Sequence, residues 1–496
     1  MRSFFDYRAL VSDAARIAAN ARARAFPCDA SRVTALHDEA ASLQTVADAL
    51  RAERRAFSMG GAGADPTRAA LGRDLRARVA AAESAETAAR VALEAAAAAL
   101  PNDTHPASPV GPERAARVLG TVGTPRSFND FVPADHVALG ARLGLFDWDG
   151  AVTSAGSGFA SFSDAGVRLE LAIVQWALSR AAAAGFSLRA PPDIARRSLL
   201  EGCGFMPRGG SPLAANIFSL APPDDALALV GTAEVPLAAL RAGMLLDAEA
   251  AREPALFAGW GRCFRREAGG AGLATKGLYR LHQFTKVELF AFVAPCATPP
   301  AAFTDPEAHE FPAIARALAQ PAPEGVVTLQ GGPAASPASD AIFSRFVDLQ
   351  ASLAAELGLA ARVVDMPTEE LGASAFRKVD VEAWMPARGA SGSWGEISSA
   401  SACTDYQARR LGMRYRASAR AGDVKFLHTL NATAAAVPRL VLALLETHQD
   451  AKGNVRIPAA LRPFLGGIDL LEPPRERRWA FAAGPWGGLR GGENKK

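Results

Sequence analysis

The sequence contains few cysteines, no long apolar run and only a small excess of charge, and each shortage excludes a class of protein. Its five cysteines are scattered and form no Cys-x-x-Cys pair, which argues against a disulfide scaffold or a cysteine-rich zinc site and fits a reducing compartment. No apolar run is long enough to span a membrane. The formal net charge of +3 is too small to identify a nucleic-acid binder, so the location of the charges matters more than their sum.

Length and composition predict a soluble protein with more than one domain. A chain of 496 residues exceeds one ordinary core, so we expect two or three domains. Hydrophobic residues make up 49% and charged residues 21%, which is typical of soluble globular proteins. Residues 1–26 contain arginines without lysine and few acids, which is similar to a mitochondrial transit peptide, and a folded N-terminal element is the alternative.

Two long helices are predicted in the N-terminal part of the chain. Apolar residues at heptad spacing predict the first helix over about 32–59, and an alanine-rich pattern predicts the second over 67–100. Glycine and proline in 58–66 mark a turn, and a short turn returns the second helix beside the first as an antiparallel hairpin. The apolar positions are Val33, Leu36, Ala40, Leu43, Ala47 and Leu50 in the first helix and Leu71, Leu75, Val79, Ala82, Ala89 and Leu93 in the second.

Arginines gather near the predicted tip of this hairpin. Seven of them lie between positions 51 and 78, against three acidic residues. A protruding arm with arginines at its far end is suited to phosphate contacts with an RNA, and a solvated helix face is the plainer alternative. The candidate RNA-binding residues are Arg51, Arg54, Arg55, Arg68, Arg73, Arg76 and Arg78.

The chain changes character after a proline-rich stretch. Residues 101–112 predict an extended linker, and short β-like runs with medium helices from about 118 predict an α+β domain. Proline, alanine and glycine in 295–340 predict a surface insertion that is partly disordered and without catalytic importance. We therefore expect an arm and linker over 1–117, a catalytic domain over 118–475 and a flexible tail over 476–496.

The most informative stretch is CFRREAGGAGLATKGLYRLHQFTKVELFAF, residues 263–292. Two alternating, aromatic-bearing runs around a glycine-rich turn predict two antiparallel strands joined by a long hairpin. Such a hairpin places an arginine, a glutamate and an aromatic ring on one concave sheet face. These groups suit ATP, which requires a cation for its phosphates, an acceptor for the adenine amino group and a ring for stacking.

This stretch resembles motif 2 of the class II aminoacyl-tRNA synthetases, and its HQFTKVE ending is similar to that of the seryl-tRNA synthetases. Three further stretches carry the same resemblance: GTAEVPLAAL (231–240), GEISSASACTDYQARRL (395–411) and LNATAAAVPRLVLALLETHQDAKGNVRIPAALRPFLGG (430–467), of which the last resembles motif 3. The resemblance spans nearly the whole chain. It implies an α+β fold in which the helical arm precedes a class II catalytic domain, an antiparallel β-sheet flanked by helices.

The resemblance also implies roles for single residues. Arg265, Glu396 and Arg439 are implied to be catalytic, and Glu396 and Ser399 supply the hard oxygen ligands that Mg²⁺ prefers. A serine substrate requires carboxylates for its ammonium group and a fixed partner for its hydroxyl. The implied serine-binding residues are Thr232, Ala233, Glu234, Arg265, Glu288, Asn431 and Thr433. The implied ATP-binding residues are Arg265, Arg266, Glu267, Phe284, Glu396, Ile397, Ser398, Ser399 and Arg439.

Taken singly, these residues have plainer interpretations. Glu234 could be an acid at a helix start, and Phe284 could be a core residue. Arg265 and Glu267 could form a surface ion pair. Their order along the chain, rather than any one of them, carries the functional interpretation.

Several positions depart from the family's common pattern. Asn-Ala-Thr-Ala at 431–434 replaces Asn-Gly-Ser-Gly, and this form with AVPR after it resembles the mitochondrial branch of the family. The resemblance therefore favours the mitochondrial matrix, with the cytoplasm as the alternative. Gly158 and Leu273 stand where basic residues are common, which bears on contacts with the tRNA acceptor end rather than on ATP.

The implied activity is a two-step ligase reaction with L-serine, ATP and tRNA(Ser). Residues 165–193 predict an amphipathic helix, a short strand and a proline pair, the unit that forms the dimer interface in the family, so a homodimer is implied. One alternative is a synthetase-derived RNA-binding or regulatory protein that no longer charges tRNA. The other is an amino acid:carrier-protein ligase, although those relatives lack the long arm.

Overall fold

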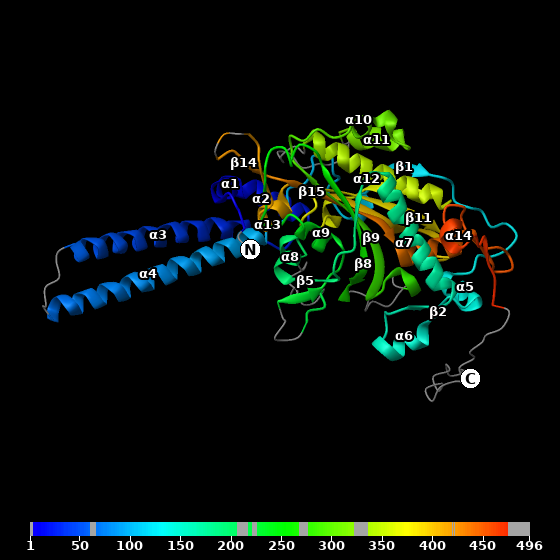
Figure 1. Cartoon of the computed structure of the whole chain (residues 1–496), viewed down its shortest axis with the longest axis horizontal. Coiled ribbons are helices and arrows are strands. Elements are labelled where there is room, and N and C mark those ends of the chain that lie inside the picture. Colours follow the sequence, from blue (N-terminus) through cyan, green and yellow to red (C-terminus); the bar gives the residue numbers. More distant parts are fainter. Residues whose placement is uncertain are drawn as a thin grey trace.

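The computed structural model describes residues 3–59, 66–205, 217–220, 226–266, 276–321, 336–418, 420 and 422–474. Two long helices project together from a body built around one large sheet (Figure 1). None of the helices within these ranges combines the length and the apolarity that crossing a bilayer demands. All five cysteines are free, as their spacing predicted.

The projecting arm is the predicted helical hairpin. It consists of α3 (Ala30–Met59) and α4 (Pro66–Ala98), which pack side by side along their length (Figure 1). The heptad positions Val33, Ala47 and Val79 are buried between the helices, as predicted. Leu71 is 59% exposed, so its assignment to the apolar seam is wrong. The seam ends before the tip, where Phe57 lies against Gly72 instead.

The segments on either side of the arm pack against the body. Helices α1 (Tyr7–Ser12) and α2 (Ala14–Ala23) lie at the base of the arm and contact α3. The predicted linker does not act as a free spacer, because the Asn102 side chain donates hydrogen bonds to the carbonyls of Ser374 and Cys403, both at 2.9 Å. Its polar groups are satisfied by the body, which the proline content of the segment did not reveal.

The body is organised by an eight-stranded sheet in the order β1-β10-β11-β12-β15-β9-β8-β4. All neighbours are antiparallel except β4 and β8, which confirms the predicted α+β class. The strands are β1 (Arg117–Val122), β10 (Ala361–Asp365), β11 (Arg377–Met385), β12 (Ser393–Ala402), β15 (His428–Ala436), β9 (Gln283–Val293), β8 (Ala255–Phe264) and β4 (Ser187–Arg189). The predicted hairpin of 263–292 is formed by β8 and β9.

The longest helices that pack against this sheet are α7 (Ala165–Ala183), α12 (Pro337–Glu356) and α14 (Val437–His448). The strand β15 runs directly into α14. The other helices are α5 (His136–Leu143), α6 (Trp148–Ala155), α8 (Arg197–Gly202), α9 (Glu234–Ala239), α10 (Ala301–Thr304), α11 (Pro312–Ala319) and α13 (Tyr406–Leu411).

Short elements complete the body. The 3₁₀ turns are η1 (Glu113–Ala115), η5 (Gly277–Tyr279), η6 (Pro306–Ala308), η7 (Thr368–Glu370) and η8 (Arg462–Leu465). The remaining strands are β2 (Phe146–Asp147), β3 (Ser161–Phe162), β5 (Ile194–Arg196), β6 (Leu227–Leu229), β7 (Leu245–Leu246), β13 (Arg414–Arg416), β14 (Val424–Phe426), β16 (Val455–Arg456) and β17 (Leu470–Leu471).

The expected surface insertion contains a helix that belongs to the core. Helix α11 buries Ile314 and Leu318 against α12 and β1. The guanidinium of Arg377 also donates a hydrogen bond to the Leu318 carbonyl at 2.9 Å. The apolar residues recur at helical spacing, so the helix has a buried stripe although the surrounding composition is typical of loops. Residues 322–335 lie outside the described ranges.

Candidate functional site

Two β-bulges decide which polar side chains meet on the sheet. The register of β11 and β12 shifts between Val381 and Glu382, so β12 carries one extra residue there. Glu396 and Ser399 are an odd number of positions apart and would face opposite sides of a regular strand. Because the bulge inserts a residue between them, both line the same cavity.

The second bulge lies in the pairing of β15 with β9, between Thr433 and Ala435. It leaves Thr433 directly opposite Glu288. Along β9, Phe284, Lys286 and Glu288 recur at every second position and therefore share one face. The two strands together present an aromatic ring, a cation, a carboxylate and a hydroxyl toward the same space.

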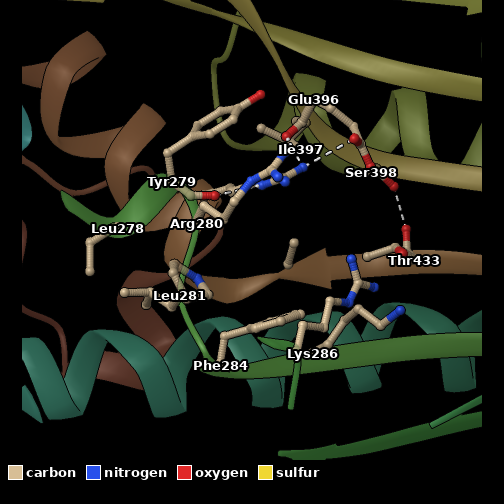
Figure 2. Close-up of a pocket in the computed structure, with 14 residues that line it drawn as sticks. Leu278, Tyr279, Arg280, Leu281, Phe284, Lys286, Glu396, Ile397, Ser398 and Thr433 are labelled. Carbon is tan, nitrogen blue, oxygen red and sulfur yellow. Dashed lines mark hydrogen bonds and ion pairs between the residues drawn. The ribbon is translucent and has the colours of Figure 1, made fainter. Parts of the chain in front are cut away.

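That space consists of two adjoining cavities. The narrow cavity has a volume of about 90 Å³ and the wide cavity about 520 Å³. In Figure 2, Phe284 and Lys286 lie on one side of the narrow cavity, and Tyr279, Glu396 and Ile397 lie on the other. The residues that line both cavities are Arg265, Lys286, Glu396 and Thr433.

The wide cavity has an acidic end built on Glu234 and Glu288. Gln407 and Asn431 both donate hydrogen bonds to Glu234 Oε1, at 2.6 Å and 3.0 Å. Thr232 Oγ1 donates to Glu288 Oε2 at 3.1 Å, and Lys286 Nζ lies 2.5 Å from the same oxygen. In the described part of the chain, Glu234 Oε2 has no hydrogen-bond partner and remains available to a bound cation.

Burial makes this acidic end sensitive to pH. Desolvation, followed by repulsion from Glu288, raises the pKa of Glu234 to about 7. Desolvation also raises the pKa of Glu288, and the charge of Lys286 opposes that rise. A ligand with an ammonium group would stabilise the Glu234 carboxylate further, in addition to the charges of Lys286 and Arg265.

The narrow cavity has a basic end in which two arginines are fixed. Arg439 Nε donates to the Tyr279 carbonyl at 3.1 Å, and its Nη1 lies 3.2 Å from Glu396 Oε2. Arg265 Nε donates to the Gly231 carbonyl at 3.3 Å, and its guanidinium lies 5.3 Å from the centre of the Phe284 ring. An anion that entered between the cavities would meet both cations.

Glu396 stays ionised at this junction. Desolvation works against ionisation, but the charges of Arg439, Lys378 and Arg265 outweigh it and lower the pKa of Glu396 to about 2. Glu396 and Ser399 therefore offer a carboxylate and a hydroxyl oxygen on one sheet face, a donor set that fits a hard divalent ion. Within the described residues, no cluster of three or more His, Cys, Asp or Glu could hold a metal on its own.

Most of the predicted site residues converge on these two cavities. Phe284, Glu396, Ile397, Ser398, Thr433 and Arg439 line the narrow one, and Thr232, Glu234, Arg265, Glu288, Ser399 and Asn431 line the wide one. Ala233 is buried at the start of α9. Arg266 is placed elsewhere, with its guanidinium 5.8 Å from the Phe218 ring. Glu267 and Leu273 lie outside the described residues.

The sequence predictions missed several cavity residues, and five polar ones bear on the site. Lys286 and Tyr279 of the hairpin, Lys378 of β11 and Ser401 of β12 line the cavities. Gln407 of α13 donates a hydrogen bond to Glu234. Lys286 had a usable signal, because it lies at alternate spacing between Phe284 and Glu288. Gln407 had none in its spacing, because a tertiary contact brings it to Glu234.

The predicted RNA-binding arginines of the arm fall into two groups. Within the described residues, Arg54, Arg55 and Arg73 are exposed and form no ion pair or side-chain hydrogen bond. The others are engaged in the arm itself: Arg51 pairs with Asp48, Glu83 and Glu86, Arg68 donates to the Phe57 carbonyl, Arg76 donates to the Gly72 carbonyl, and Arg78 pairs with Glu53 and Asp74.

The departure at Gly158 has a structural counterpart. Gly158 has a φ of 82°, a conformation that glycine adopts without strain, and its carbonyl accepts a hydrogen bond from His282 N at 2.8 Å. The position therefore supports the hairpin through its backbone, beside the strand that carries Phe284.

Comparisons with known proteins agree with this geometry. The family described as "tRNA synthetase class II core domain (G, H, P, S and T)" matches residues 334–448. The serine–tRNA ligase of Rhodopirellula baltica is 40% identical over 403 residues, 81% of this chain and 83% of the relative. That of Nocardia farcinica is 38% identical over 476 residues, 95% of this chain and 99% of the relative. A crystal structure of seryl-tRNA synthetase from Pyrococcus horikoshii complexed with ATP superposes with a TM-score of 0.76 at 28% identity, covering 95% of this chain and all of that one.

Proposed function

The chain belongs to the seryl-tRNA synthetases, the class II ligases that join serine to its tRNA, and we propose that its two cavities divide the substrates of that reaction. The wide cavity binds L-serine, and the narrow cavity binds the adenosine part of ATP. One observation carries this division: Arg265, Lys286, Glu396 and Thr433 line both cavities, so the two substrates would meet at these residues.

Serine would bind with its ammonium group at the acidic end of the wide cavity. Glu234 and Glu288 supply the negative charge, and Asn431 orients Glu234 through its hydrogen bond. Thr433 lies opposite Glu288 on the neighbouring strand and supplies a hydroxyl for the substrate hydroxyl. Alanine lacks that hydroxyl, so its binding would leave the buried Thr433 hydroxyl without a hydrogen-bond partner and would be weaker than the binding of serine.

ATP would bind with its adenine beside Phe284 and its phosphates toward Arg265 and Arg439. The related seryl-tRNA synthetase structure from Pyrococcus horikoshii was solved with ATP, which supports ATP as a substrate. Mg²⁺ would be held by Glu396 and Ser399 and would neutralise phosphate charge when bound.

The activation step needs no side-chain nucleophile. The serine carboxylate attacks the α-phosphate, which gives seryl-adenylate and releases pyrophosphate. A hydroxyl of the terminal adenosine of tRNA(Ser) then attacks the seryl carbonyl, which forms the ester and releases AMP. Arg265 lies where both cavities meet, so it can hold the carboxylate and the α-phosphate together. Catalysis would therefore rest on positioning and on neutralisation of charge.

Serine-dependent exchange between ATP and pyrophosphate, measured with and without tRNA(Ser), tests this function. We expect exchange without tRNA, and charging of tRNA(Ser) when it is added. Exchange without any charging would favour an amino acid:carrier-protein ligase. Binding of tRNA without exchange would favour a regulatory RNA-binding protein.

The arm, the assembly and the location complete the proposal. Arg54, Arg55 and Arg73 would contact the tRNA backbone. Val167 and Leu171 are exposed one helical turn apart on α7, which supports a homodimer through this helix. We propose the mitochondrial matrix, with the cytoplasm as the alternative, on the Asn-Ala-Thr form at 431–433. Fractionation of cells that express the tagged chain would distinguish the two compartments.

A further inference from the structure

One wall of the narrow cavity is a short turn that two helices hold in place. Leu278 and Tyr279 of η5 line the cavity. The Tyr279 carbonyl accepts a hydrogen bond from Arg439 Nε at 3.1 Å, and the Leu278 amide donates to His136 Nε2 at 3.2 Å. The turn is thus fixed by α14 on one side and by the first residue of α5 on the other.

The buried side chain of His136 has a defined protonation pattern in this arrangement. A backbone amide can only donate, so Nε2 must carry the lone pair and the single ring proton lies on Nδ1. Nδ1 then donates to Glu446 Oε1 at 2.9 Å. The other Glu446 oxygen is also engaged, because it accepts a hydrogen bond from Ala387 N at 3.1 Å. Each polar atom of the ring therefore has one partner, and the ring cannot rotate without losing both.

Helix α14 reaches the turn twice. Arg439 and Glu446 are seven positions apart, which is about two helical turns, so they project from the same face. Arg439 holds the Tyr279 carbonyl directly, and Glu446 holds the Leu278 amide through His136. The turn is thereby tied to the helix that also carries the arginine of the phosphate site.

Further contacts show that the turn packs closely around His136. A Cβ at Gly277 would lie 2.2 Å from His136 Nε2, so only glycine allows the turn to approach the ring. Lys276 Nζ, on the preceding residue, pairs with Asp135 at 2.5 Å. The Tyr279 ring lies between two guanidinium groups, 3.9 Å from Arg388 and 4.6 Å from Arg439. A shift of the turn would therefore move the Tyr279 ring and both of its cationic neighbours.

We propose that His136 is a positioning residue for ATP: it does not touch the nucleotide, but it fixes the turn that shapes the narrow cavity and anchors Arg439. The inference rests on the proposed assignment of that cavity to ATP. A purely structural histidine would instead affect stability and both substrates alike.

Two variants, each of which keeps one of the two hydrogen bonds of the imidazole, distinguish a positioning role from a purely structural one. In His136→Gln, the side-chain oxygen reaches the place of Nε2 and can accept the Leu278 amide, and the contact with Glu446 is lost. In His136→Asn, the shorter amide can donate to Glu446, and the Leu278 amide loses its acceptor. The Michaelis constants for ATP and for serine are measured by pyrophosphate exchange, and thermal unfolding of each variant is recorded.

We expect the Michaelis constant for ATP to rise about tenfold in His136→Asn, because the buried Leu278 amide loses its acceptor, and no more than about threefold in His136→Gln, which keeps that acceptor. The serine constant should not change in either variant. Equal ATP constants in the two variants, or parallel changes for ATP and serine, would overturn the proposal.

A third variant covers the case in which both replacements fail to fold. Gly277→Ala presses on Nε2 from the turn and leaves His136 intact, so it should also raise the ATP constant without changing the serine constant. An unchanged ATP constant in folded Gly277→Ala would refute the positioning role. Equilibrium binding of ATP is measured alongside: a wild-type protein that binds ATP without serine-dependent exchange would contradict the proposed function and leave the role of His136 to be judged on ATP binding alone.

Discussion

The arm and the catalytic body use the same charged residues in different surroundings. On the arm, Arg78 lies 3.6 Å from Glu53 and 3.8 Å from Asp74, and about half of each of these side chains is exposed. In the body, Lys286 and Glu288 are 2.5 Å apart, with side-chain exposures of 7% and 2%. Exposed pairs contribute about 0–1 kcal/mol, whereas removal of one partner of a buried pair costs about 3–5 kcal/mol. The arm should therefore tolerate single charge changes that the body does not.

At the base of the arm, charged residues change from exposed to buried. Arg410 of α13 is buried and donates hydrogen bonds to the carbonyls of Ala98 and Leu100, at the end of α4. Burial lowers the pKa of Arg410 to about 10. The same short helix carries Gln407, which binds Glu234. One element thus contacts both the arm and the serine cavity.

The largest expected effect comes from Arg265, where the two cavities meet. Arg265→Ala should lower serine-dependent pyrophosphate exchange by about a hundredfold or more, because a charge-assisted contact of about 3 kcal/mol to the transition state is lost. Arg252→Ala is the matched control, since Arg252 is exposed and pairs with Glu249 outside the cavities. Near-normal exchange by folded Arg265→Ala would contradict the site.

The next effect concerns the charge of Glu234. Its pKa is raised to about 7, so the carboxyl group takes up a proton as the pH falls below that value, and the Michaelis constant for serine should then rise. The stability of the fold should also depend on pH. In the unfolded chain the Glu234 carboxyl ionises near its ordinary pKa of 4.5, whereas in the folded protein it ionises near 7, so the protein should lose stability as the pH rises from 4.5 to about 7.

Glu234→Gln should remove both pH dependences and raise the serine constant at pH 8 by about tenfold or more, since an ammonium–carboxylate contact is lost. The constants are measured by pyrophosphate exchange between pH 5.5 and 8.5 with saturating ATP. A serine constant of the wild type that is flat across this range would exclude Glu234 as the ionised partner.

A smaller effect is expected at Thr433. Thr433→Val keeps the shape and removes the hydroxyl, so serine binding should weaken by about 1–2 kcal/mol and discrimination against alanine should fall with it. Thr433→Ser is the matched control and should be tolerated. Unchanged serine affinity and alanine rejection in the valine variant would indicate that Thr433 only packs beside Glu288.

The smallest effect per residue is expected on the arm. Replacement of Arg54, Arg55 and Arg73 together by alanine should raise the Michaelis constant for tRNA(Ser) in the charging reaction by about fivefold to tenfold at low salt. The salt dependence of that constant should become weaker, because phosphate contacts are lost. Pyrophosphate exchange without tRNA should not change. Arg51→Ala is the comparison variant, because Arg51 forms its ion pairs within the arm. Loss of Arg51 should lower the stability of the arm rather than weaken phosphate contacts.

Local periodicity was enough to predict several elements. The heptads of α3 and α4 were predicted near their observed bounds, and a hairpin was predicted where β8 and β9 pair, although β8 begins at Ala255, before the predicted stretch of 263–292. The failures have a common cause. Leu71, the buried segment around Asn102 and helix α11 were misjudged because their burial depends on which distant surface lies beside them.

Sequence by itself determined which chemical groups the site would contain and their order along the chain. Tertiary structure decided how they face one another: bulges beside Glu382 and Thr433 align the carboxylate and hydroxyl groups, and α13 brings Gln407 to Glu234. It also decided that His136 would meet Leu278. Local backbone preferences are set by neighbouring residues, whereas a bulge or a contact between distant segments depends on the packing of the whole sheet and its helices.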